Sequence, residues 1–184
     1  MCDQLFVVTG GPGSGKSSLI NKLASHGFRT KLEAGRAIIK DQVRMGGAAL
    51  PWADKALFAE LMLCWELRSY LEASADPSVT ILDRGIPDVV GYLTLCGLPV
   101  PDYLERAAAL HPYNRTVFLA PYWDQIFTND DERKQGVDEA KATADIMHET
   151  YTRLGYEIVE LPLIDIDARA DFVRDHIGRR QFEN

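Results

Sequence analysis

Residues 5–19 read LFVVTGGPGSGKSSL, and the predicted architecture follows from them. Four apolar residues at the start are typical of a buried strand, and they lead directly into glycines. Gly10, four further residues, Gly15, Lys16 and Ser17 then match the pattern of a phosphate-binding loop. Glycine adopts backbone angles that are closed to other residues, so several N–H groups of such a loop can point at one anion.

The side chains of this stretch complete a predicted nucleotide site. Lys16 brings a mobile positive charge to the β- and γ-phosphates, and the Ser17 hydroxyl can bind Mg²⁺. The helix that is predicted to begin near Gly15 adds the positive end of its dipole. We therefore expect a nucleoside triphosphate to bind here. The loop consists of Gly10, Gly11, Pro12, Gly13, Ser14, Gly15, Lys16 and Ser17.

The composition predicts one soluble globular domain: the chain has 184 residues, of which 46% are hydrophobic and 26% charged. The net charge of −7 argues against sequence-independent nucleic-acid binding, which needs a basic surface. No apolar run long enough to span a membrane occurs, and no signal peptide is recognisable. Cys2, Cys64 and Cys96 form no CxxC pair, so we expect reduced thiols in a cytoplasmic protein, with Cys64 in the core.

Apolar patterns along the chain predict five strands that alternate with helices. The strands are expected near residues 5–8, 28–32, 79–82, 116–119 and 156–161. The helices are expected at 17–26, around 38–43, at 52–75, after a cap at Asp88, and at 103–110, 137–154 and 165–177. This alternation predicts an α/β fold with a mainly parallel sheet. Residues 1–178 are expected to form the domain and residues 179–184 a frayed tail.

Ligands of such sheets collect beyond the carboxyl ends of the strands. Asp83 closes one apolar run and Arg84 follows it. An acid that faces a phosphate loop can hold Mg²⁺, and an adjacent acid and guanidinium can bind an acceptor hydroxyl and a phosphate. We therefore expect Asp83 as a metal ligand and catalytic residue, and Asp83 with Arg84 as substrate-binding residues. The alternative is a solvated surface turn.

Glu33 and Arg36 follow the second predicted strand at a spacing of one helical turn. A carboxylate at this place can orient an attacking hydroxyl or accept its proton. We expect Glu33 to be catalytic, and both residues to bind the acceptor. The alternative is an ordinary ion pair at a helix start.

Residues 121–136 are predicted to form a mobile lid that is polar and rich in charges. Closing positive charge over a phosphoryl group stabilises its transition state and excludes water. Arg133 is the expected catalytic residue of this lid, with Lys134 assisting, and the alternative is an exposed charged loop.

Several side chains of the long helix and three tryptophans are predicted to be buried by packing. In the long helix 52–75, apolar positions recur at intervals of three and four, which predicts a buried stripe. This stripe consists of Leu57, Leu61, Cys64, Trp65, Arg68 and Leu71. Trp52, Trp65 and Trp123 are expected to be packing residues, and Trp123 has the alternative of bordering the acceptor pocket.

Five motifs occur in order over nearly the whole chain: GGPGSGKSS at 10–18, EAGR at 33–36, DRGIPD at 83–88, DDERKQ at 130–135 and LGYEIVELP at 154–162. Together they resemble the NadR-like P-loop domains, also called the AAA-28 family of ATPases and kinases. The resemblance implies a three-layer P-loop fold of the nucleoside- and nucleotide-kinase type, with strand order 2-3-1-4-5.

The same resemblance implies ATP and Mg²⁺ at residues 10–18, which adds Ser18 to the loop. It implies that Glu33, Arg36, Asp83 and Arg84 face the phosphoryl acceptor and that Arg133 belongs to the lid. In NadR proteins this domain phosphorylates a nicotinamide riboside, whereas the acceptor of the present chain stays open.

These observations favour an ATP-dependent kinase that acts on a small-molecule acceptor, for which a nucleoside-like compound is a candidate. Two alternatives remain: a regulatory switch with slow hydrolysis, and a plain NTPase with water as the acceptor. The acceptor-side residues favour the kinase, because a switch has no need of a second pocket. No NKxD-type motif follows a strand, so a Ras-like GTPase is not expected.

Overall fold

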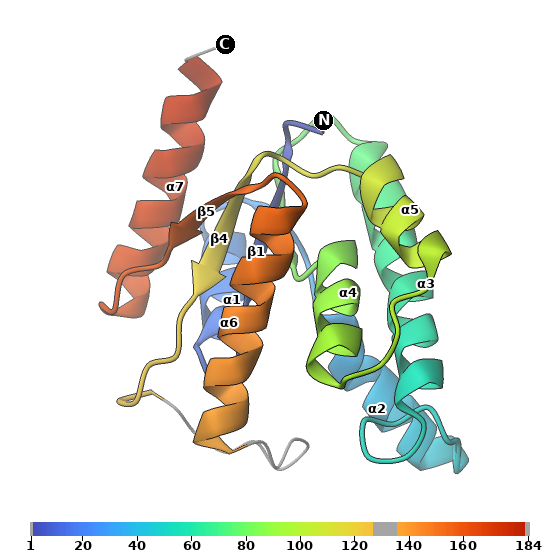
Figure 1. Ribbon diagram of the computed structural model, residues 1–184. Coiled ribbons are helices and arrows are strands. Elements are labelled where there is room, and N and C mark those ends of the chain that lie inside the picture. The colour runs from blue at the N-terminus through green and yellow to red at the C-terminus, as the bar shows by residue number, and fades with distance from the viewer. Residues whose placement is uncertain (1, 127–135, 183–184) are drawn as a thin grey trace.

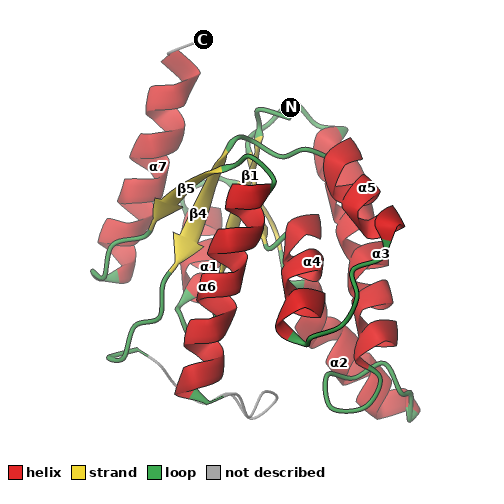
Figure 2. Cartoon of the chain, viewed as in Figure 1, coloured by secondary structure: helices red, strands yellow, loops and turns green. Residues whose placement is uncertain are grey.

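Five parallel strands form the centre of the protein in a computed structural model that describes residues 2–126 and 136–182. They are β1 (Leu5–Gly10), β2 (Arg29–Lys31), β3 (Thr80–Asp83), β4 (Thr116–Ala120) and β5 (Glu157–Glu160). Their order is β2-β3-β1-β4-β5, so the predicted order and the parallel pairing are both confirmed. Figure 2 shows the strands in yellow between the helices.

Helices cover both faces of the sheet. They are α1 (Lys16–Ser25), α2 (Ala34–Met45), α3 (Lys55–Ser74), α4 (Ile86–Leu95), α5 (Asp102–Leu110), α6 (Val137–Arg153) and α7 (Ile166–Phe182). Figure 1 shows α7 and α3 on opposite sides of the strands. Among the described residues, none of the helices combines the length and the apolar composition that crossing a membrane requires.

The central strand β1 explains the three layers, because all of its side chains are buried. Leu5 and Val7 pack with residues of α3, α4 and α6, whereas Phe6 and Val8 pack with residues of α1 and α7. Successive side chains of a strand point to opposite faces, so a continuous apolar run is what a strand covered on both faces requires.

The buried face of α3 differs from the predicted stripe. The helix buries Phe58, Ala59, Leu63, Glu66, Ser69, Tyr70 and Ala73. Leu57, Trp65 and Leu71 are instead 44%, 41% and 58% exposed, and Cys64 is an exposed free thiol. The prediction that Cys64 lies in the core is therefore wrong, and so is the packing role of Trp52, which is 62% exposed.

Several element boundaries also differ from the predictions. Helix α3 begins at Lys55, where the Asp54 carboxylate accepts a hydrogen bond from Leu57 N at 2.9 Å and caps the helix. Helix α7 continues to Phe182, beyond residue 178, where the predicted domain ends. Arg133 and Lys134, the predicted residues of the lid, lie outside the described residues.

Candidate functional site

The phosphate-binding loop joins β1 to α1 and depends on its glycines. Gly10, Gly13 and Gly15 have φ angles of 131°, 69° and 81°, which side chains disfavour. Gly11 needs its missing side chain for another reason, since a Cβ there would overlap the carbonyl oxygen of Ala140 in α6. The loop is therefore fixed both by its own backbone and by its close approach to α6.

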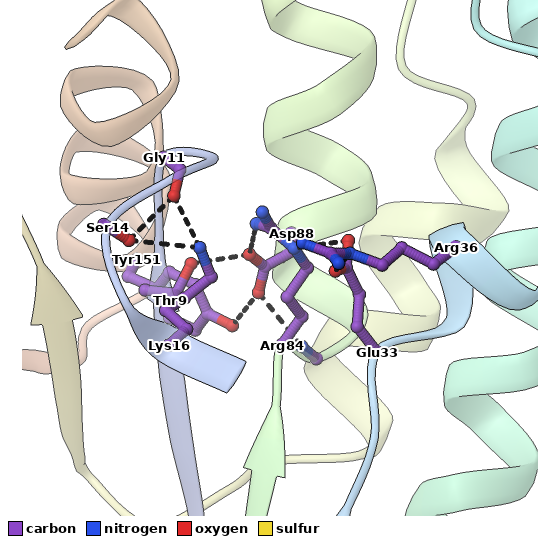
Figure 3. A network of polar contacts seen from close by, with 10 residues as sticks. Thr9, Gly11, Ser14, Lys16, Glu33, Arg36, Arg84, Asp88 and Tyr151 are labelled. Carbon is purple, nitrogen blue, oxygen red and sulfur yellow. Dashed lines mark hydrogen bonds and ion pairs between the residues drawn. The ribbon is translucent and has the colours of Figure 1, made fainter. Parts of the chain in front are cut away.

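Lys16 is the first residue of α1, and its ammonium group is held inside the loop (Figure 3). Its Nζ donates to Gly11 O at 2.5 Å and to Ser14 Oγ at 3.3 Å. The side chain is only 7% exposed. A cation surrounded by loop oxygens and next to a helix N-terminus is suited to phosphate oxygens.

A cavity of about 540 Å³ opens at this loop. Besides loop residues 12–18 it is lined by Glu33, Arg36, Trp123, Ile126, Ile164, Asp165, Ile166 and Arg169. Trp123 thus borders the loop cavity.

Arg169 anchors one wall of this cavity. Its guanidinium donates from Nη1 to Ser14 O at 3.0 Å and from Nε to Pro162 O at 2.7 Å, and it lies 4.8 Å from the centre of the Trp123 ring. The side chain is 1% exposed, and this burial lowers its pKa. The flat indole and guanidinium groups leave one face of the cavity suited to a planar ring.

Asp88 lies at the centre of the polar network in Figure 3. Its Oδ1 accepts from Thr9 Oγ1 at 2.5 Å and from Arg84 Nη1 at 2.9 Å. Its Oδ2 accepts from Tyr151 Oη at 2.6 Å and from Gly85 N at 3.0 Å. Contrary to the prediction, Asp88 does not precede the helix: α4 begins at Ile86 after the N-cap Gly85, and Asp88 lies in its first turn, where its carboxylate accepts from Gly85 N. The same carboxylate also joins β1 and α6 to α4.

Arg84 is positioned by two carboxylates. Its Nε donates to Glu33 Oε1 at 3.2 Å and its Nη1 to Asp88 Oδ1 at 2.9 Å. Burial opposes the charge, but the carboxylates of Glu33 and Asp88 raise the pKa of Arg84 above its ordinary value, so the group stays cationic. Among the described residues, Arg84 alone combines a side chain with a positive φ, of 79°. This backbone strain is typical of functional positions.

Asp83 ends β3 beside the phosphate loop and is 3% exposed. Its Oδ1 accepts no hydrogen bond from any described residue. Burial and the neighbouring Glu33 raise the pKa of Asp83 to about 6, against the opposing effect of Lys16 and Arg84. An orphaned buried carboxylate oxygen next to a phosphate loop fits Mg²⁺, which takes one or two carboxylates and completes its shell with phosphate and water.

A second cavity, of about 280 Å³, lies on the other side of Glu33. It is lined by Pro12, Glu33, Gly35, Pro51, Trp52, Phe58, Met62, Glu66, Arg84, Gly85, Asp88, Val89, Tyr92, Leu95, Glu139, Thr143 and Met147. Pro12 and Glu33 line both cavities, so the two spaces meet at these residues.

The structure brings most of the predicted residues together around this junction. Glu33 occupies the N-cap position of α2 without a capping side-chain hydrogen bond. Its Oε1 accepts from Arg84 Nε, and its Oε2 lies 3.7 Å from Arg36 Nε. Arg84 lines the second cavity, whereas Arg36 lines the loop cavity. Arg36 therefore lies on the phosphate-loop side of this junction.

Four residues at the site escaped the sequence analysis: Thr9, Glu66, Tyr151 and Arg169. Glu66 had a detectable signal, since it replaces an apolar residue in the series Ala59, Leu63, Glu66, Tyr70 and Ala73 at helical spacing. Thr9, Tyr151 and Arg169 carry no such signal, because only their tertiary contacts distinguish them from other residues of their types.

Solved structures with a similar fold are kinases and a NadR protein. Thymidylate kinase from Ehrlichia chaffeensis is 14% identical, with a TM-score of 0.66 over 96% of this chain and 98% of that one. Deoxyadenosine kinase from M. mycoides is 12% identical, with a TM-score of 0.68 over 95% and 99%. The NadR protein in complex with NR is 16% identical, with a TM-score of 0.68 over 96% of this chain and 52% of that one. At these identities the similarity establishes the fold.

Sequence comparison establishes the family. No curated protein matches the chain in sequence. The profile of the AAA-28 family, described as an AAA domain, matches residues 5–169, which include the phosphate loop, Glu33 and the Asp83–Asp88 turn. The chain therefore belongs to the AAA-28 family of AAA domains.

Proposed function

We propose that the protein is an ATP-dependent kinase that transfers the γ-phosphoryl group to a small hydroxyl-bearing acceptor. The observation that carries this proposal is the pair of cavities that meet at Glu33 and Pro12. One cavity contains the phosphate loop, and the other is a largely apolar space of a size that suits a small metabolite. A nucleotide switch or a plain NTPase needs only the cavity that contains the phosphate loop.

The loop residues Gly10–Ser18 would hold ATP, with Lys16 at the β- and γ-phosphates. Trp123 and Arg169 would bind the base at the far wall of the cavity. Ser17 and Asp83 would hold Mg²⁺, which would neutralise charge on the phosphates. The orphaned Oδ1 of Asp83 supports this assignment.

Glu33 would act between the two cavities. The acceptor oxygen attacks the γ-phosphorus, the bond to the β–γ bridging oxygen breaks, and the hydroxyl proton passes to the Glu33 carboxylate. Lys16 and Arg36, which line the loop cavity, would stabilise the negative charge of the transferring group. Arg84 would hold Glu33 in place and bind the acceptor, and Arg133 would close over the phosphoryl group.

The similar structures support a nucleoside-like acceptor. Two of them are described as thymidylate kinase and deoxyadenosine kinase, and a third is a NadR protein in complex with NR. A cytoplasmic location is part of the proposal, because ATP and the free thiols Cys2, Cys64 and Cys96 are both suited to that compartment.

ADP release from ATP and Mg²⁺, with and without a panel of nucleosides, nucleoside monophosphates and sugars, tests this proposal. One compound should stimulate release and should appear as its phosphate ester by ³¹P NMR. Lys16→Ala should abolish turnover, whereas Lys22→Ala, at a partly exposed position on the same helix, should retain it. Turnover that survives Lys16→Ala, or ADP release that no acceptor stimulates, contradicts the assignment. The latter result would indicate a plain NTPase.

A further inference from the structure

The second cavity carries an excess of acidic side chains. Among the described residues, four carboxyl groups line it, those of Glu33, Glu66, Asp88 and Glu139, against the single guanidinium of Arg84. This guanidinium already contacts both Glu33 and Asp88. An incoming anion therefore meets several carboxyl groups, and the only cation on the described lining is engaged.

The loop cavity has the opposite character. Lys16, Arg36 and Arg169 line it, together with the carboxylates of Glu33 and Asp165. Since charges interact strongly in partly buried sites, a phosphate group is favoured in the loop cavity and disfavoured in the second one. The charge pattern thus separates a phosphate-binding half from a half that suits an uncharged or cationic compound.

Glu66 is the unusual group in the second cavity. It lies on the buried face of α3, is 5% exposed, and makes no hydrogen bond or ion pair with any described residue. Buried polar groups are almost always hydrogen-bonded, so this carboxyl on the cavity wall is available to a partner that comes from outside the chain. Burial, with Asp88 and Glu33 adding to it, raises the pKa of Glu66 well above its ordinary value, which favours the neutral acid. A neutral carboxyl both donates and accepts hydrogen bonds.

The apolar part of the cavity fits a flat ring. Phe58 and Tyr92 line it with ring centroids 5.5 Å apart in an edge-to-face arrangement, and Met62 and Met147 are also on its walls. Aromatic and thioether groups pack well against a planar ring. Such a ring needs at least one polar partner for its N–H or carbonyl groups, and among the described residues Glu66 is a lining side chain with its hydrogen-bonding capacity unused.

We propose that Glu66 selects the acceptor: it hydrogen-bonds a polar group on the ring of an unphosphorylated nucleoside-type alcohol, while the neighbouring carboxylates of Glu33, Asp88 and Glu139 exclude the corresponding phosphate. The inference rests on the proposed function and narrows its substrate class. Glu66 is a binding residue here, and the transfer step remains with Glu33 and the phosphate loop.

Calorimetric titration of the ATP-free protein with four matched pairs tests the inference. The pairs are adenosine and AMP, guanosine and GMP, cytidine and CMP, and thymidine and TMP. At least one nucleoside should bind about tenfold or more tightly than its 5′-monophosphate. Glu66→Met should weaken that nucleoside about tenfold or more, while Glu66→Gln should nearly preserve its affinity, because an amide also donates and accepts.

Two controls separate specificity from folding. Glu60→Met changes an exposed carboxylate on the same helix and should leave nucleoside affinity unchanged. Glu66→Met should raise the thermal unfolding temperature, because it replaces an unpartnered buried carboxyl by an apolar side chain. A Glu66 variant that binds nucleosides poorly while folding more stably would therefore support a direct binding role.

The inference is overturned if no nucleoside binds, if a monophosphate binds as tightly as its nucleoside, or if Glu66→Met leaves the affinity unchanged. The measurements distinguish failure of this inference from failure of the proposed function. ATP-dependent phosphorylation of a nucleoside monophosphate would keep the kinase and remove the role of Glu66. Nucleoside binding that depends on Glu66, without any ATP-dependent transfer, would keep the role of Glu66 and remove the kinase.

Discussion

Replacement of Asp83 by Asn should stabilise the folded protein and at the same time inactivate it. Burial, with the charge of Glu33, raises the pKa of Asp83 to about 6 from an ordinary value of 3.8. A carboxyl group whose pKa is higher in the folded state favours folding most below the lower value, and this contribution is lost as the pH rises through about 6. The difference between the two values corresponds to roughly 3 kcal/mol of unfolding free energy at pH 8.

The Asn side chain has nearly the same shape and no charge, so Asp83→Asn should recover most of this loss. The pKa of about 6 already includes the attraction to Lys16 and Arg84. Part of the gain is offset because the Asn amide brings an NH₂ group that needs hydrogen-bond acceptors of its own. We expect a net gain of roughly 2 kcal/mol at pH 8, or about 4–8 °C in unfolding temperature for a chain of this size. The gain should shrink towards pH 4.5, where the wild-type carboxyl of the folded state is protonated. Thermal unfolding in phosphate-free buffer with EDTA, from pH 4.5 to 8, measures it.

Asp88→Asn is the matched control, because a neighbouring carboxylate should give the opposite result. Asp88 accepts four hydrogen bonds, and an amide would place an NH₂ group against some of those donors. We expect Asp88→Asn to lower the free energy of unfolding by roughly 2–4 kcal/mol. The reasoning about Asp83 is refuted if its Asn variant is destabilised at pH 8 or if its gain does not vary with pH. ATP-dependent ADP release should meanwhile fall about 100-fold or more, since an amide is a poor Mg²⁺ ligand.

Three further changes test other parts of the site. Gly11→Ala should abolish ATP-induced thermal stabilisation and lower the free energy of unfolding by roughly 2 kcal/mol or more, because the new Cβ would overlap Ala140 O. A normal thermal shift with ATP would contradict this close approach. Tyr151→Phe removes one donor to Asp88 and should cost roughly 1–2 kcal/mol in urea unfolding, whereas an unchanged midpoint would mean that this hydrogen bond contributes nothing. Trp123→Leu should raise the KM for ATP about tenfold with little change in kcat, and initial rates that show an unchanged KM would exclude Trp123 from base binding.

The sequence was most informative where chemistry restricts both residue type and spacing. The phosphate loop needs Gly10, Gly15, Lys16 and Ser17 in a fixed register after a strand, and all of them occupy the predicted place. Strands β1, β3 and β4 could be predicted because a strand covered on both faces is largely apolar. Strands β2 and β5 are only partly buried and include charged residues, so this reason does not extend to them. The order of the strands could not follow from periodicity, which says nothing about neighbours in a sheet, and was predicted from the resemblance to the family.

Helix α3 shows where sequence patterns fail. Its apolar residues occur on more than one side, with Leu57 and Leu71 as regularly spaced as Phe58 and Leu63. Periodicity cannot choose between such stripes, because the choice depends on packing against α4 and on the cavity beneath. The error in the predicted face also concealed Glu66, whose position on the buried side gives it its chemical interest.

The hydrogen bonds of Asp88 have a consequence for how the protein opens. The buried Asp88 carboxylate accepts hydrogen bonds from segments that are far apart along the chain. The donors belong to Thr9, to Arg84 and Gly85, and to Tyr151. If any one segment separated, a charge would be left in the interior with too few donors, which is costly. The end of β1, the start of α4 and the end of α6 should therefore behave as one cooperative unit, with a common opening free energy in native-state hydrogen exchange.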